Sequence, residues 1–123
     1  MNVIDYDNPI ELMIDIIRDQ SKKRILLLLE RTKKQGYEIC QELKDLKSEI
    51  VNMEVAQLVE MGLLKRKIHV RKQPYGVEYV LTNQGAMVVR SILSLEEIGI
   101  YVMEQYHMED VLIKQGYRNK PQQ

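Results

Sequence analysis

The chain has 123 residues, 45% hydrophobic and 29% charged, which is the composition of one folded domain and excludes a disordered chain. Its 18 basic and 18 acidic side chains give a formal net charge of zero, which argues against a nonspecific polyanion binder. No apolar run approaches the roughly 20 residues of a membrane span. The first residues lack a signal-peptide pattern, so we expect a soluble cytoplasmic protein.

Helices are predicted through the first half of the chain. The dipeptide Asn8–Pro9 is a helix-start signal, and apolar residues recur with helical spacing over residues 10–17. A second helix is predicted over residues 21–34, with Ser21 as its N-cap and Gly36 as its end. Residues 37–46 are predicted to form a short third helix.

The next predicted helix extends from Ser48, which caps it, to Met61. Gly62 follows in the position of a left-handed C-cap. The helix has an apolar face at spacings of 4, 3 and 1, formed by Val51, Val55, Leu58 and Val59.

From Leu64 the period of apolar residues changes from 3.6 to 2, which predicts a strand. One row is expected to face the core and consists of Leu64, Arg66, Ile68 and Val70. The other row is expected to face solvent and consists of Lys65, Lys67, His69 and Arg71. A turn at residues 73–76 and a return strand with Val77, Tyr79 and Leu81 inward complete a β-hairpin with one basic face.

A final helical region is predicted from Asn83, capped by Thr82, to about Lys114. It carries a seam that approximates a heptad repeat, formed by Val88, Ile92, Leu95, Val102 and Tyr106. A domain of this size offers a long apolar helix little to pack against, so the seam predicts a homodimer; the alternative is packing on the first helix. We therefore expect a first part over 1–95, a dimerisation helix over 96–117 and a flexible tail over 118–123.

The sequence predicts neither an enzyme nor a metal site. The sequence has no Gly-rich phosphate loop, nucleophile elbow or paired His/Cys arrangement. Glu104 and His107, with Asp110, form at most half of a carboxylate–histidine metal site and are interpreted as solvent-facing. The single cysteine, Cys40, is predicted to be a buried structural thiol; a redox sensor or an intersubunit bridge is the alternative. No cofactor is expected.

Two stretches of sequence together resemble a known family. They are Leu58 to Leu64, which reads LVEMGLL, and Pro74 to Gly85, which reads PYGVEYVLTNQG. This combination is most similar to the HxlR group of winged-helix repressors, and the MarR and PadR groups share a weaker version. The likeness extends over about residues 8–95, although Asn8 stands where that group usually has a cysteine and residues 45–48 depart from its usual Gly-Ile-Ser-like entry. It implies a mainly α fold with a small β-hairpin, a winged helix-turn-helix with a long C-terminal dimerisation helix.

In a helix-turn-helix, the second helix lies in the major groove of DNA. The resemblance assigns this role to residues 48–61, where Asn52 and Gln57 have the groups to recognise adenine and Glu49 can accept from cytosine. The helix has no Lys or Arg, so cations near it must hold the phosphates. A second basic cluster, Lys22, Lys23 and Arg24, is interpreted as the solvated first turn of the second predicted helix. The predicted DNA-binding residues are Lys44, Lys47, Ser48, Glu49, Asn52, Met53, Gln57, Lys65, Lys67, His69, Arg71 and Lys72. The alternatives are that the helix residues only face solvent and that the basic strand is an edge protected by charge.

These features predict a sequence-specific regulator of transcription, a repressor, that binds a pseudo-palindromic double-stranded operator as a homodimer. The alternative function is a winged-helix module for protein contact, which uses the acidic face with Glu49, Glu54 and Glu60. A groove between the first and last helices is a candidate site for a small-molecule effector, lined by Tyr101, Met103 and Tyr106; ordinary interface packing is the other interpretation of these three residues.

Overall fold

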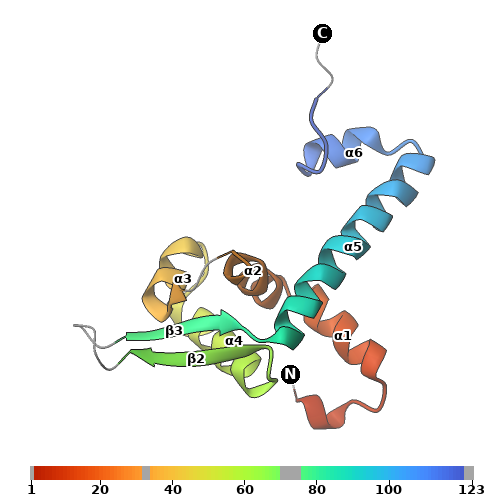
Figure 1. Ribbon diagram of the computed structural model, residues 1–123. Coiled ribbons are helices and arrows are strands. Elements are labelled where there is room, and N and C mark those ends of the chain that lie inside the picture. The colour runs from red at the N-terminus through yellow and green to blue at the C-terminus, as the bar shows by residue number, and fades with distance from the viewer. Residues whose placement is uncertain (1, 32–33, 70–75, 121–123) are drawn as a thin grey trace. The chain divides into compact units, whose positions relative to one another are not determined.

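The computed structural model describes residues 2–31, 34–69 and 76–120. Its elements in chain order are η1 (Val3–Asp5), α1 (Pro9–Arg18), α2 (Gln20–Leu29), β1 (Lys34–Gln35), α3 (Gly36–Glu42), α4 (Ser48–Glu60), β2 (Leu64–His69), β3 (Gly76–Leu81), α5 (Asn83–Gln105) and α6 (Glu109–Lys114) (Figure 1). This confirms the predicted fold class, mainly α with a β-hairpin. The chain divides into two compact units, residues 1–89 and 90–123, and α5 is continuous through the boundary.

The core of the first unit lies where α2, α3 and α4 meet the base of the sheet. α2 and α4 pack against each other, and α4 also packs against α3 and β2. The apolar face predicted for the fourth helix is confirmed for the buried residues Val51, Val55 and Leu58. In α1, by contrast, Ile16 is buried and the predicted apolar residues Ile10 and Ile14 are exposed.

The second helix differs from its prediction at both ends. Asp19 is the N-cap, because its Oδ1 accepts a hydrogen bond from the backbone N of Lys22 at 3.2 Å, and α2 ends at Leu29. Residues 34–35 are not helical but form β1, which pairs with β3. Gly36 begins α3 instead of ending the helix before it. A two-residue strand depends on a partner more than 40 residues away, so local periodicity does not predict it.

The sheet is antiparallel in the order β1–β3–β2, and β2 and β3 form the predicted hairpin. The expected inward row of β2 is correct only at its base, where Leu64 is 2% exposed. Arg66 is exposed and Ile68 is 69% exposed. The outer ends of β2 and β3 lie away from α2 and α4 (Figure 1), and Ile68 and Val77 are both exposed there. Val70 and the turn at residues 73–75 lie outside the described residues.

The last helical region begins as predicted and then breaks. Thr82 Oγ1 accepts a hydrogen bond from Gly85 N at 3.0 Å, which confirms the predicted cap. The single predicted helix is two helices, because His107 has a φ of 58° between α5 and α6. Within the described ranges, no helix is both long and apolar enough to cross a membrane.

Candidate nucleic-acid interface

α3 and α4, joined by residues 43–47, form a helix-turn-helix. α4 buries one face in the core and exposes the opposite one. Five of its exposed residues recur at intervals of 3, 1, 3 and 4, so they form one stripe along the helix. We call this the α4 stripe; it consists of Glu49, Asn52, Met53, Ala56 and Glu60.

Three of the predicted DNA-reading residues lie on the α4 stripe: Glu49, Asn52 and Met53. Ser48 is exposed at the first turn of the same helix, although its side chain forms no cap and the N-cap is Lys47. Asn52 Oδ1 accepts a hydrogen bond from the thiol of Cys40 at 3.7 Å. Cys40 is therefore half-buried beside α4 and not fully buried as predicted.

Glu54 and Gln57 lie on the other side of α4, toward α2. Glu54, which was expected to face outward, is 7% exposed and forms an ion pair with Lys22. Gln57 is half-buried, and its Oε1 accepts a hydrogen bond from Lys22 Nζ at 2.7 Å. Lys22 is itself 1% exposed, so the predicted solvated turn at this residue is wrong. A periodic pattern does not show that a lysine 32 residues away supplies the counter-charge for Glu54.

Lys44 and Lys47, two of the predicted DNA-binding residues, are exposed on the connection between α3 and α4. The acid between them, Asp45, is occupied by Arg24, whose NH1 and NH2 donate to its two carboxylate oxygens at 2.7 and 2.8 Å. This hydrogen bonding lowers the pKa of Asp45 and raises that of Arg24. The ion pair leaves Lys44 and Lys47 as the net charge of this connection.

The hairpin carries the second group of cations. Lys65 is exposed, and Lys67 is half-buried opposite Glu78 in the register of β2 and β3. His69 is the last residue of β2 and lies opposite Gly76. Arg71 and Lys72 lie outside the described residues.

Arg66 is an exposed cation, although the alternation of residue types predicts it in the inward row. The charge of Arg66 could have predicted its exposure, because a cation within an apolar row indicates that the row leaves the core at that point.

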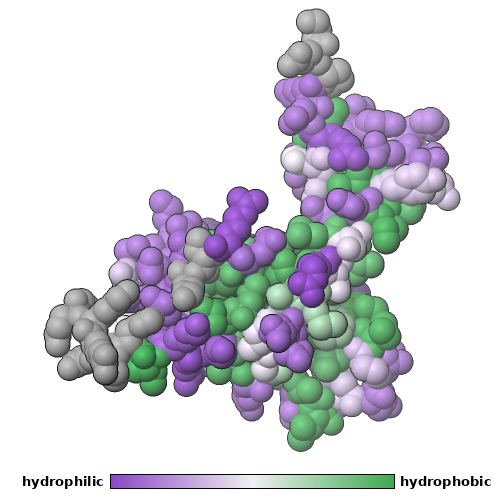
Figure 2. Space-filling model, in the orientation of Figure 1, coloured by the Kyte–Doolittle hydropathy of each residue, from purple (hydrophilic) through white to green (hydrophobic). Residues whose placement is uncertain are grey.

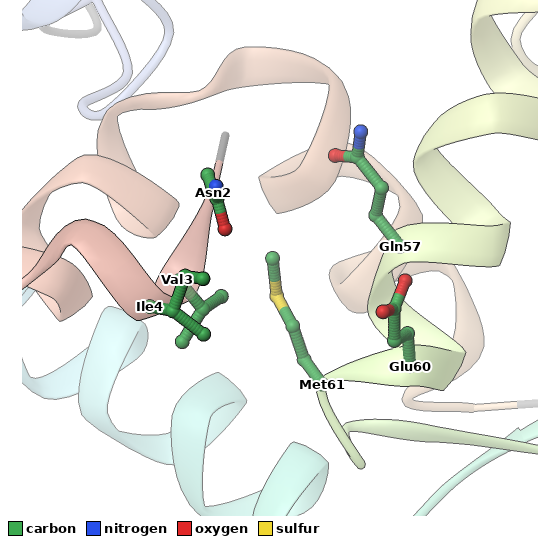
Figure 3. A pocket seen from close by; sticks show the side chains of 6 residues that line it. All are labelled: Asn2, Val3, Ile4, Gln57, Glu60 and Met61. Carbon is green, nitrogen blue, oxygen red and sulfur yellow. The ribbon is translucent and has the colours of Figure 1, made fainter.

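A cavity of about 340 Å³ opens between η1 and the C-terminal half of α4. Its lining combines apolar and polar side chains, with Met61 extending between the two segments (Figure 3). The lining residues are Asn2, Val3, Ile4, Gln57, Glu60 and Met61. A second cavity of about 130 Å³ shares Val3 and Met61 with it. Neither cavity is lined by Tyr101, Met103 or Tyr106, the residues predicted to line an effector site.

Only part of the predicted dimer seam is exposed. Val88 and Ile92 are covered within the chain, whereas Leu95, Val102 and Tyr106 are exposed. In residues 90–120 apolar side chains reach the surface (Figure 2), and Ile98 and Tyr101 extend the exposed part of the seam.

Glu104, a residue of the half metal site, pairs with Arg118 at 3.0 Å. The described residues contain no group of three His, Cys, Asp or Glu suited to a metal.

Comparison with known proteins gives both a family and a set of structures. A family model described as HxlR-like helix-turn-helix matches residues 16–107. No curated protein matches the sequence.

Three solved structures are similar over most of their length. A MarR-family transcriptional regulator from Enterococcus faecalis V583 is 21% identical, with a TM-score of 0.72, 80% of this chain covered and 89% of that one. The reduced form of the transcriptional regulator YodB from B. subtilis is 16% identical, with a TM-score of 0.67 and coverage of 75% and 90%. The redox regulator HypR in its reduced form is 24% identical, with a TM-score of 0.66 and coverage of 80% and 100%. These likenesses establish the fold.

Proposed function

The chain belongs to the family of HxlR-like helix-turn-helix proteins, and from this membership we propose that it is a homodimeric repressor that binds double-stranded DNA at specific sequences. One observation carries the proposal. The α4 stripe is exposed on the second helix of a helix-turn-helix, and the exposed cations Lys44, Lys47 and Lys65 lie on the segments that precede and follow that helix. Phosphate contacts position such a helix, and contacts to bases provide its specificity.

In this proposal the N-terminal half of α4 enters the major groove. Asn52 recognises adenine through its amide, since the thiol contact at 3.7 Å is weak and easily replaced. Glu49 accepts from cytosine, and Ser48 and Met53 complete the contact surface. Gln57 has no part in reading bases, because Lys22 engages its carbonyl oxygen on the side toward α2.

Cations around α4 bind the phosphates. Lys44 and Lys47 contact the backbone near the start of α4, and the hairpin contacts the flanking backbone. The hairpin residues assigned to this role are Lys65, Arg66, Lys67, His69, Arg71 and Lys72.

The dimer is proposed to form through residues 96–117 together with Leu95. The exposed side chains of Leu95, Val102 and Tyr106 supply apolar surface that a second copy of the chain would bury. A twofold dimer presents two copies of α4 to half-sites about one helical turn, roughly 34 Å, apart, so the operator is a pseudo-palindrome. Occupation of such a site represses transcription where it overlaps a promoter.

The test is selection of bound fragments from random double-stranded DNA, followed by fluorescence anisotropy on the selected duplex. We expect a pseudo-palindromic site that survives an excess of random competitor, with two chains bound per duplex. The double variant Lys44→Ala/Lys47→Ala should bind every duplex more weakly, whereas Asn52→Ala should change the selected site. A reporter gene under the selected site gives the sign of regulation.

Equal, salt-sensitive binding to every duplex would contradict a sequence-specific regulator. The acidic residues Glu49 and Glu60 would then favour the alternative, a module that docks its α4 stripe on a basic protein. A stable partner recovered after nuclease treatment would establish that function.

A further inference from the structure

The ammonium group of Lys22 joins α2 to α4, the helix that carries the proposed DNA-binding surface. Its Nζ donates to Asp19 Oδ2 at 3.2 Å, to Gln57 Oε1 at 2.7 Å and to Glu54 Oε2. Asp19 caps α2, and Glu54 and Gln57 lie three residues apart on α4. An ammonium group has three donors, so all three are used on three acceptors from two helices.

Stability alone does not account for this arrangement. Lys22 is 1% exposed and Glu54 is 7% exposed, so both charges have been removed from water at a cost that their attraction only offsets. Apolar residues of similar volume would fill the same space and leave stability nearly unchanged. Apolar contacts have no preferred direction, whereas hydrogen bonds do. The bond to Asp19 orients the ammonium group on α2, and the bonds to Glu54 and Gln57 then restrict the placement of α4.

We propose that Lys22 is a positioning residue that fixes the rotation of α4 about its own axis. The remaining face of α4 toward the core consists of similar aliphatic side chains, Val51, Val55 and Leu58, which tolerate small rotations. Lys22 holds Glu54 and Gln57 toward α2 and thereby directs Glu49, Asn52 and Met53 outward. It acts on DNA recognition without touching DNA, and in this respect the inference rests on the proposed function.

The experiment replaces the buried pair by apolar residues in the double variant Lys22→Met/Glu54→Met. The matched control is Arg24→Gln/Asp45→Asn, which removes an exposed ion pair between α2 and the connection before α4. Three quantities are measured on each protein: the urea midpoint of unfolding, the rate at which a thiol reagent labels Cys40, and the ratio of affinities for the selected site and for random DNA. Cys40 is the single cysteine of the chain, and its thiol contacts Asn52, so its labelling rate reports the placement of α4 without DNA.

We expect the apolar pair to unfold near the wild-type midpoint, to label Cys40 at least threefold faster, and to lose about tenfold in the affinity ratio. The control should lose only the small stabilisation of an exposed ion pair, and it should match wild type in the labelling rate and in the affinity ratio. Wild-type labelling and an unchanged affinity ratio in the folded apolar variant would overturn the inference. If the wild-type protein shows no preference for any duplex, the proposed function fails, and the labelling rate alone decides the role of Lys22.

If the protein with Lys22→Met/Glu54→Met does not fold, a second variant, Lys22→Arg, tests the inference. Lys22→Arg retains the charge opposite Glu54, but its planar guanidinium does not reproduce three donors on one nitrogen. Faster labelling of Cys40 in this variant supports positioning by direction. An unchanged rate shows that charge neutralisation suffices and overturns the inference.

Discussion

The hydroxyl of Thr82 donates a hydrogen bond to the carbonyl oxygen of Gly62 at 2.6 Å, and so joins the end of α4 to the start of α5. Thr82 Oγ1 also accepts a hydrogen bond from Gly85 N at 3.0 Å, and the backbone N of Thr82 donates to Leu63 O at 3.1 Å. One threonine therefore caps a helix and fastens it to the turn that precedes the hairpin. This geometry explains why threonine and glycine occur three residues apart in the segment that resembles the family.

Replacement of Gly85 by alanine is expected to destabilise the protein. A Cβ at this position would lie 2.1 Å from Leu63 O, and that oxygen belongs to the backbone, which cannot move aside cheaply. We expect a loss of about 2–3 kcal/mol in the free energy of unfolding, measured with urea, as for other overpacked sites.

Gly99→Ala is the matched control for Gly85→Ala, because Gly99 lies in the same helix and a Cβ there meets nothing within 4 Å. Because Gly99 lies in the proposed dimer interface, both substitutions are compared in the monomeric background Leu95→Glu/Tyr106→Glu. There Gly99→Ala should gain about 0.5–1 kcal/mol, since alanine is the better helix former. Equal effects of the two substitutions would contradict the close approach at Gly85.

Thr82→Val removes the hydroxyl and retains the shape of the side chain. Gly62 O loses a donor and Gly85 N loses its acceptor, so we expect a loss of about 1–2 kcal/mol in the same urea experiment. Thr82→Ser keeps the hydroxyl and should retain most of the stability. The interpretation fails if serine and valine are equally destabilising.

The ion pair of Arg24 and Asp45 predicts a dependence on acid pH. The hydrogen bonds from Arg24 lower the pKa of Asp45 in the folded protein below its unfolded value. The stabilisation is thus present above the unfolded pKa, about 3.9, and is lost as the pH falls through the folded pKa. The melting temperatures of wild type and Arg24→Gln should differ near neutral pH and converge in acid. A carboxyl titration by NMR should show the pKa of Asp45 rising in that variant.

Salt dependence separates phosphate contacts from base contacts. Each phosphate contact contributes about 0.9 to the slope of log K against log salt concentration, so Lys44→Ala/Lys47→Ala should lower the slope by roughly 2. Asn52→Ala should leave the slope unchanged. Arg18→Ala, an exposed cation at the end of α1, is the control and should not affect binding. A slope that is insensitive to Lys44 and Lys47 would remove them from the interface.

Sedimentation tests the proposed dimer. The chain has a mass of 14.5 kDa, and we expect the wild type to sediment at twice this value. Leu95→Glu/Tyr106→Glu should sediment as a monomer, because both side chains are exposed and charges there oppose burial against a second copy. Ile10→Glu, at an exposed apolar residue of α1, is the control and should remain dimeric. Dimers of both variants would exclude this part of the seam from the interface.

Features that depend on nearby residues could be predicted from the sequence. The apolar face of α4 and the cap at Thr82 follow from local spacing, and Gly62 has the expected left-handed backbone, with a φ of 81°. The resemblance to the HxlR group, drawn from residues 58–64 and 74–85, is confirmed by the family match.

Features that depend on distant partners could not be predicted. β1 exists only because β3 pairs with it, and the burial of Glu54 requires Lys22 from another helix. The exposure of Ile68 follows from how far the hairpin extends, which alternation of residue types does not encode.

The acidic character of the α4 stripe has a consequence for kinetics. In the proposed complex, Glu49 and Glu60 face a polyanion, and this repulsion weakens binding to every sequence alike. Only duplexes that satisfy the base contacts offset it, so encounters with wrong sites end quickly. Such a repressor spends little of its search trapped on bulk chromosome, and it leaves its operator readily when conditions change.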